Sequence, residues 1–239
     1  MRRIAVVSGK GGVGRTTLVA NIGIALASLG KETIIINGSL TTPDLALLFK
    51  LEKSVYTLND ALAGEAKLAD VMYPGPKRVK IVPAGVTLEQ IRKAHPERLP
   101  ELMRQVPEKT DFVLIDVPSG LSRGTVSAMR AGPEVLLVAT PEMTSISDAM
   151  KTRLVAEFLG LTPIGVVLNR VRKEEFELTR DEIRSIMNVP VLAEVPEDEK
   201  ARQALKQGKP LLELSPNSPA AKAIKELARK LIRMRARAQ

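Results

Sequence analysis

Cysteine and tryptophan are absent from this sequence, and other ring-bearing residues are scarce: one histidine, two tyrosines and four phenylalanines among 239 residues. Without cysteine, the chain forms no disulfide and offers no thiolate to a metal ion, as is common in a reducing cytoplasm. Bases of single-stranded nucleic acids stack on aromatic side chains, and this sequence has too few aromatic residues to form such a stacking surface.

No apolar run is long enough to span a bilayer, and the first predicted strand begins too early for a signal peptide to precede it. We therefore expect a cytoplasmic protein.

The net charge of +9 is concentrated at the C-terminal end. Residues 220–239 contain seven basic residues and one acid, Glu226, so the rest of the chain carries only about +3. Nucleic-acid-binding proteins usually spread basic residues over a face. A nucleic-acid partner is therefore not expected.

Short β-branched apolar runs alternate with helical patterns along the whole chain. This alternation predicts one α/β domain over residues 1–239, with a doubly wound, mostly parallel sheet and helices on both faces. The Pro/Gly-rich residues 72–77 are predicted to form a surface loop. We expect strands at 3–8, 33–37, 79–82, 112–116, 134–139, 163–169 and 189–194, and the clearest helices at 16–29, 144–160 and 179–187.

Residues 9–17 read GKGGVGRTT, which matches the phosphate-loop pattern G-x-x-x-x-G-K-[S/T] except at Arg15. The loop follows a predicted buried strand and opens a predicted helix, so its backbone N–H groups would converge on one anion. The lysine that Arg15 replaces normally reaches the β- and γ-phosphates. The loop thus predicts nucleotide binding and leaves nucleotide hydrolysis in question.

The same residues also fit the dinucleotide pattern G-x-G-x-x-G, through Gly9, Gly11 and Gly14. A dinucleotide site requires an acidic residue about 20 residues further on, at the end of the second strand, to bind a ribose hydroxyl. Here the second predicted strand ends in residues 37–39, Asn-Gly-Ser. The phosphate-loop interpretation is therefore favoured.

A second motif is the apolar run 112–115 that ends in Asp116. At the carboxyl end of a parallel strand, this carboxylate would lie beside the glycine loop and could hold Mg²⁺ directly or through water. An aspartate that only caps the following turn is the alternative, and the glycine loop favours the metal.

Taken together, these motifs resemble the MinD/ParA family of deviant Walker A P-loop ATPases, and most closely its archaeal MinD-like members. The resemblance implies Mg-ATP or Mg-ADP as ligand and a nucleotide sandwich homodimer, in which Lys10 reaches the partner's nucleotide. It runs through residues 10–17, 37–45, 116–120, 167–170, 195–198 and 216–222.

The resemblance also assigns roles to individual residues. Thr16 and Asp116 would bind magnesium, Asn169 would read the adenine edge, and Pro196 and Glu197 would lie near the base. The full set implied to bind nucleotide is Gly9, Lys10, Gly11, Gly12, Val13, Gly14, Arg15, Thr16, Thr17, Asn169, Pro196 and Glu197.

Three positions depart from the family pattern on the side of the site where hydrolysis occurs. Arg15 replaces the loop lysine, and Asn37 and Ser39 stand where the family has two aspartates. A guanidinium is planar and bulkier than an ammonium, and neither asparagine nor serine can act as a general base. We predict a nucleotide-binding switch for spatial positioning with weak or absent hydrolysis. An active ATPase and a nucleotide-free interaction module remain alternatives.

Residues 218–239 are predicted to form a basic C-terminal helix, with Ile224, Leu227, Leu231 and Met234 at helical spacing. Such a helix could attach the protein to an anionic membrane surface. Because its apolar stripe is narrow, docking of the helix on the sheet is preferred. His95, in a charged stretch, is expected at the surface.

Overall fold

The computed structural model describes residues 1–120 and 122–234, which build a sheet with strand order β3-β4-β2-β5-β1-β6-β7-β8. Each neighbouring pair in this sheet is parallel except β3–β4. The strands are β1 (Arg2–Val7), β2 (Thr33–Asn37), β3 (Tyr73–Pro74), β4 (Lys80–Val82), β5 (Phe112–Asp116), β6 (Glu134–Ala139), β7 (Thr162–Val171) and β8 (Val191–Pro196).

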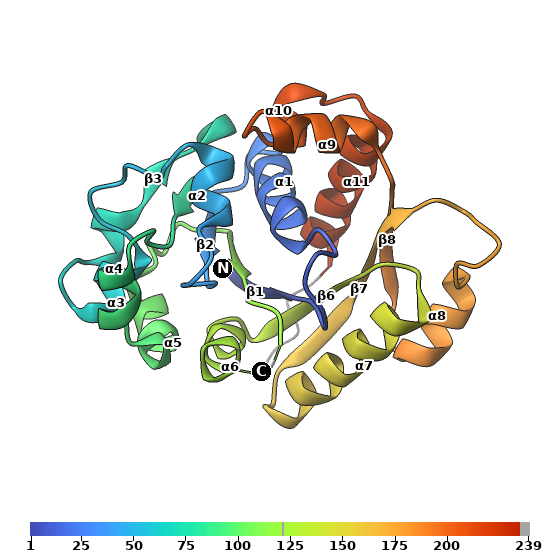
Figure 1. Cartoon of the computed structure of the whole chain (residues 1–239), viewed down its shortest axis with the longest axis horizontal. Coiled ribbons are helices and arrows are strands. Elements are labelled where there is room, and N and C mark those ends of the chain that lie inside the picture. Colours follow the sequence, from blue (N-terminus) through green and yellow to red (C-terminus); the bar gives the residue numbers. More distant parts are fainter. Residues whose placement is uncertain (121, 235–239) are drawn as a thin grey trace.

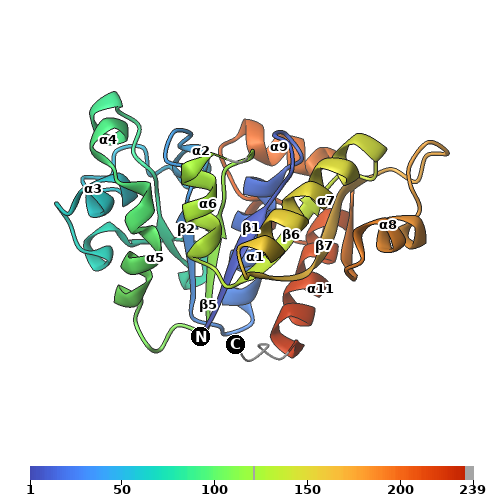
Figure 2. The same ribbon diagram turned by 90° about the horizontal axis from the view of Figure 1, so that it is seen from below.

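Helices cover both faces of the sheet, as predicted (Figure 1). In Figure 1, α1 and α11 lie on one face, and α6 and α7 lie on the other; Figure 2 shows α6 and α7 in front of the sheet. The helices are α1 (Arg15–Ser28), α2 (Asp44–Phe49), α3 (Leu58–Ala63), α4 (Leu88–Lys93), α5 (Leu99–Leu102), α6 (Arg123–Arg130), α7 (Met143–Phe158), α8 (Arg180–Met187), α9 (Glu199–Lys206), α10 (Leu211–Leu214) and α11 (Pro219–Arg233).

Two hydrophobic cores, one on each face of the sheet, explain the unbroken apolar runs of the central strands. In β1, Ile4 and Val6 face the core that contains α1 and α11, whereas Ala5 and Val7 face the core that contains α6 and α7. Successive side chains of a strand point to opposite faces, so a strand covered on both sides must be apolar throughout. The doubly wound fold is thereby confirmed.

The predicted strands all occur, with shifted ends at the C-terminal side of the sheet. β7 extends to Val171, and β8 begins at Val191 and ends at Pro196. The prediction for residues 72–77 was incomplete, because Tyr73–Pro74 form a short antiparallel edge strand with β4. A two-residue strand leaves no periodic pattern in the sequence.

The C-terminal helix α11 packs against the sheet through its apolar stripe and contacts α1 and β8. Its first turn is capped by Ser218, whose Oγ accepts a hydrogen bond from the N–H of Ala221 at 3.3 Å. The residues of the prediction beyond Met234 lie outside the described part of the chain. The buried stripe consists of Ala220, Ala221, Ile224, Leu227, Ala228 and Leu231.

Arg2 links the C-terminal end of α11 to the sheet through hydrogen bonds and an ion pair. Its Nη1 donates to the carbonyl oxygens of Leu231 and Met234, and its Nε donates to Oε2 of Glu134 on β6 at 2.8 Å. Both side chains of this ion pair are about nine-tenths buried.

Within the described residues, no helix is both long and apolar enough to cross a membrane.

The exposed edge of β8 carries two cations from neighbouring helices. Nη2 of Arg180, at the start of α8, donates to the carbonyl oxygen of Val191 at 2.8 Å. Nζ of Lys230, on α11, donates to the carbonyl oxygen of Leu192 at 3.2 Å. These side chains bind main-chain oxygens of the terminal strand.

Candidate functional site

The glycine loop connects β1 to α1 and turns sharply at two glycines with positive φ, Gly12 (+81°) and Gly14 (+85°). Gly14 precedes the first residue of α1. A Cβ at Gly14 would lie 2.3 Å from Nδ2 of Asn169, and a Cβ at Gly9 would lie 2.2 Å from the backbone of Asp148 on α7. Gly9 is therefore needed for packing against α7, and Gly14 for both its conformation and its contact with β7.

A cavity of about 590 Å³ opens beside the loop. This volume lies within the range typical of small-molecule sites. The loop amides and the N-terminus of α1 favour an anion at this position. Its lining includes the loop residues Gly11 to Thr17 together with Ser8, Ser39, Thr41, Thr42, Asp44, Leu47, Leu48, Pro118, Ser119, Arg170, Leu205 and Gly208.

Two smaller cavities adjoin the loop and contain Lys10, Asn169, Pro196 and Glu197 of the predicted nucleotide contacts, whereas Gly9 lines none of the three cavities. One, of about 270 Å³, is lined by Lys10 and by loop residues. The other, of about 140 Å³, is lined by Asn169, Pro196 and Glu197 together with Gly14 and Thr17. The structure thus brings together segments that are more than 150 residues apart in the sequence.

Arg15 folds back toward the sheet and forms an ion pair with Asp116. Its Nε lies 2.6 Å from Oδ1 of Asp116, and its Nη1 donates to Oγ of Ser8 at 3.0 Å. The Arg15 side chain is 11% exposed and that of Asp116 is 1% exposed. Sequence reasoning missed Ser8, a small polar residue at the end of β1 whose partner is visible only in the fold.

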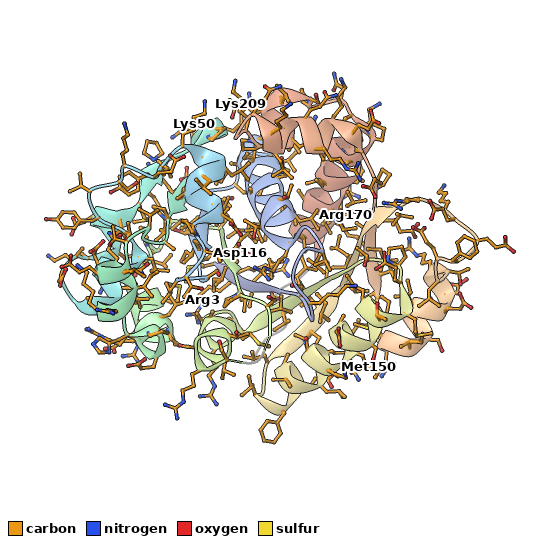
Figure 3. The ribbon with its side chains drawn as sticks, viewed as in Figure 1. Arg3, Lys50, Asp116, Met150, Arg170 and Lys209 are labelled. Atoms are coloured by element: carbon orange, nitrogen blue, oxygen red, sulfur yellow. The ribbon has the colours of Figure 1, made fainter. Side chains whose placement is uncertain are left out.

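Asp116 is held at the centre of the site by the register of three strands. It aligns with Val6 of β1 and with Asn37 of β2, at the carboxyl end of the sheet. Burial raises the pKa of the Asp116 carboxyl and the charge of Asp44 adds to the rise, whereas Arg15 and Thr16 oppose it. Figure 3 shows Asp116 and Arg170 on either side of α1.

Thr16 and Asp116, which the resemblance assigns to magnesium, contact each other directly. Oγ1 of Thr16 donates to Oδ2 of Asp116 at 2.7 Å, while Oδ1 is bound by Arg15. Each oxygen of the carboxylate therefore already accepts one hydrogen bond, and its negative charge is paired with the Arg15 guanidinium. Within the described residues, no group of three or more acidic, histidine or cysteine side chains could hold a metal ion. This donor set does not fit magnesium while the Arg15–Asp116 pair is intact.

Asn37 and Ser39 stabilise the turn that follows β2. Nδ2 of Asn37 donates to the carbonyl oxygen of Thr42 at 3.2 Å, and its Oδ1 accepts from the N–H of Ser39 at 3.2 Å. Oγ of Ser39 lies 2.6 Å from Oγ1 of Thr42. Both side chains are buried. Neither supplies a charge to the cavity.

Lys10 and Asn169 both contact parts of their own chain. Nζ of Lys10 lies 3.5 Å from Oε2 of Glu142, which precedes α7. Nδ2 of Asn169 donates to the carbonyl oxygen of Val13 at 2.7 Å and so holds the glycine loop against β7. The roles that the resemblance assigns to these two residues, toward a partner's nucleotide and toward adenine, stay predictions.

Glu197 is bound by two arginines beside the small cavity. Its carboxylate pairs with Arg172 at 2.8 Å and with Arg202 at 2.7 Å. The hydrogen bond from Arg172 is the main cause that holds the pKa of Glu197 below its ordinary value, although partial burial opposes it. Arg170, which the sequence analysis did not assign, has a positive φ of 58° and lines all three cavities.

A family model called ParA, described as an NUBPL iron-transfer P-loop NTPase, matches residues 1–232. The chain belongs to the ParA family. It is 42% identical to an uncharacterized ATP-binding protein of Methanocaldococcus jannaschii over 99% of this chain and 89% of that protein.

Solved structures of MinD proteins share the fold of this ParA-family chain. The Pyrococcus horikoshii septum site-determining protein MinD, complexed with Mg-ADP, superimposes with a TM-score of 0.93 and 38% identity, covering 97% of this chain and 96% of that chain. MinD in the MinC:MinD complex of Aquifex aeolicus gives a TM-score of 0.88 and 28% identity, covering 100% and 98%. The predicted resemblance to MinD and ParA proteins, including archaeal ones, is confirmed.

Proposed function

We propose that this ParA-family protein is a MinD-like nucleotide switch that binds ATP or ADP and hydrolyses ATP slowly or not at all. The observation that carries the proposal is the buried ion pair between Arg15 and Asp116, beside an otherwise complete glycine loop. The loop supports binding of the phosphates, and the ion pair opposes their cleavage.

Binding is supported by the loop and by the relatives. Converging N–H groups and a helix N-terminus favour phosphate groups, and the 590 Å³ cavity has room for a nucleotide. The Methanocaldococcus relative is named as ATP-binding, and the Pyrococcus MinD was solved with Mg-ADP. Thr16, Thr17 and the loop amides would hold the phosphates, and Asn169, Pro196 and Glu197 would lie near the base.

Weak hydrolysis is expected because the positive charge of Arg15 is bound by protein groups and does not face the phosphates. In P-loop enzymes, catalysis depends on a positive charge that stabilises the transferred phosphoryl group and on a group that orients the attacking water. Here the Arg15 guanidinium is held by Asp116 and Ser8. The amide of Asn37 and the hydroxyl of Ser39 are bound within their own turn and cannot accept a proton as a carboxylate does.

A role in spatial positioning, in cell division or partitioning, is supported by the MinD relatives. The Aquifex relative was solved as a MinC:MinD complex, so a protein partner is part of the proposal. A nucleotide-dependent homodimer would bring the half-buried Lys10 toward a second copy. Iron transfer, named in the family model's description, is opposed by the sequence, because iron–sulfur clusters are held mainly by cysteine thiolates and this chain has no cysteine.

A comparison of binding and turnover tests the proposal. Calorimetry should show binding of ADP and of a non-hydrolysable ATP analogue, and steady-state assays should show little ATP turnover. The triple variant Arg15→Lys, Asn37→Asp, Ser39→Asp should gain activity. Turnover by the wild-type protein at the rate of an active MinD assayed in parallel would instead establish an ATPase. Absence of any nucleotide binding would establish an interaction module that keeps only the fold.

A further inference from the structure

We propose that this protein binds its nucleotide without magnesium. The reason is that the Arg15 guanidinium forms an ion pair with Asp116, the carboxylate that would otherwise face the metal ion. This inference rests on the proposed nucleotide binding. It adds the chemical form of the ligand, a metal-free nucleoside di- or triphosphate.

Both oxygens of the Asp116 carboxylate already accept hydrogen bonds, and its negative charge is paired with Arg15. Arg15 binds Oδ1 at 2.6 Å and Thr16 binds Oδ2 at 2.7 Å. A magnesium ion held directly or through water at this carboxylate would lie beside the Arg15 guanidinium and compete with it for the same negative charge. Displacing Arg15 would leave a buried guanidinium unpaired, which is among the costly changes in a protein interior.

The residues around the Arg15–Asp116 pair add little negative charge. Asn37 lies next to Asp116 in the sheet and is neutral, and Ser39 is neutral as well. Among the described residues that line the large cavity, the acid is Asp44, which is exposed. Mg²⁺ requires near-ideal octahedral geometry and usually binds one or two carboxylates in addition to phosphate oxygens. This site offers one buried carboxylate, already neutralised, and a cation beside it.

Beside the glycine loop, the protein supplies positive charge of its own. Arg170 lines the large cavity, and Lys10 and Arg170 line the adjoining cavity across the glycine loop. Cationic side chains and convergent N–H groups are the usual protein ligands of phosphate oxygens. A polyphosphate that lacks magnesium presents more negative charge to these groups than its magnesium complex does.

The experiment measures the dissociation constant of the full chain for ADP and for a non-hydrolysable ATP analogue, in excess magnesium and in EDTA. The wild-type protein should bind as tightly or more tightly in EDTA. Arg15→Lys, which removes the guanidinium from Asp116, should bind at least about tenfold more tightly with magnesium. Arg130→Lys, an exposed conservative change on α6, is the matched control and should behave as the wild type does.

Manganese provides a readout that does not depend on affinity. Electron paramagnetic resonance should show no protein-immobilised Mn²⁺ in the wild-type protein with ADP, and immobilised Mn²⁺ in Arg15→Lys. Tighter wild-type binding with magnesium than with EDTA, or immobilised Mn²⁺ in the wild type, would overturn the inference and leave the proposed nucleotide switch standing. No binding under either condition would overturn both.

Discussion

Replacing Arg2 should test how firmly the C-terminal helix α11 is fixed to the sheet. The Arg2 guanidinium binds both oxygens of Glu134, at 2.8 and 3.1 Å, and two carbonyl oxygens at the end of α11. Its Cζ lies 5.6 Å from the centre of the Phe112 ring. Arg2→Ala removes all of these interactions and leaves the Glu134 carboxylate buried without its partner.

The expected loss in the free energy of unfolding is about 3–5 kcal/mol, the usual cost of removing one member of a buried ion pair. A loss of that size is a large part of the roughly 5–15 kcal/mol by which a domain is stable. Arg2→Met combined with Glu134→Leu removes both charges and keeps apolar volume. The double variant should recover most of the loss, because no unpaired charge remains.

Urea unfolding followed by circular dichroism measures the loss, and hydrogen exchange shows where it acts. Amide protection in α11 should decrease in Arg2→Ala more than protection in α7, which lies on the other face. Arg3→Ala is the matched control, since no ion pair of Arg3 occurs within the described residues, and should change stability by less than about 1 kcal/mol. A similarly small loss in Arg2→Ala would refute the role assigned to this side chain.

Three further predictions concern the glycine loop, an acidic cap and the vesicle surface. Gly14→Ala should weaken ADP binding at least about tenfold in calorimetry, because φ is +85° and the new Cβ would lie 2.3 Å from Nδ2 of Asn169. Asp60→Asn should lower the free energy of unfolding by about 1–3 kcal/mol at neutral pH. Burial opposes ionisation of Asp60, but hydrogen bonds from Lys93 and Thr57 hold its pKa below the ordinary value. The protein should not sediment with neutral lipid vesicles, because the apolar stripe of α11 is buried.

Each of these predictions has a control or a contradicting outcome. Gly30 also has a positive φ, of 78°, with nothing near an added Cβ, so Gly30→Ala should reduce stability and leave ADP binding unchanged. Because the pKa of Asp60 is lowered in the fold, its stabilisation is present above the ordinary carboxyl pKa of about 4 and decreases below it. A pH-independent effect of Asp60→Asn would contradict this. Binding to neutral vesicles would indicate that α11 leaves the sheet.

The sequence predicts the sheet well because its strands are buried on both faces. Residues 33–36 are Thr-Ile-Ile-Ile, a β-branched run that has one plausible place in a parallel sheet. The short strand Tyr73–Pro74 has no such pattern and was missed. The stripe of α11 has the same spacing whether it faces a membrane or a sheet, so only the packing against α1 and β8 distinguishes the two.

The candidate site was predictable as a set of residues but not as a set of contacts. Glycines, Thr16, Asp116 and Asn169 are recognisable at fixed places relative to strands. The pairing of Arg15 with Asp116 cannot be recognised in this way. It depends on a strand register that aligns Val6 with Asp116, 110 positions further along the chain. The direction in which a long, flexible side chain points is decided by such tertiary neighbours.

An open sheet ends in a strand whose main chain could pair with a strand of another molecule. On β8, Arg180 and Lys230 bind main-chain oxygens, and Arg180 also pairs with Glu194 of the same strand at 3.0 Å. A second copy brought to the edge would meet these two cationic side chains, and its strand would have to displace both. Pairing of a second copy with this edge is thereby disfavoured, as is usual for edge strands that carry charged side chains.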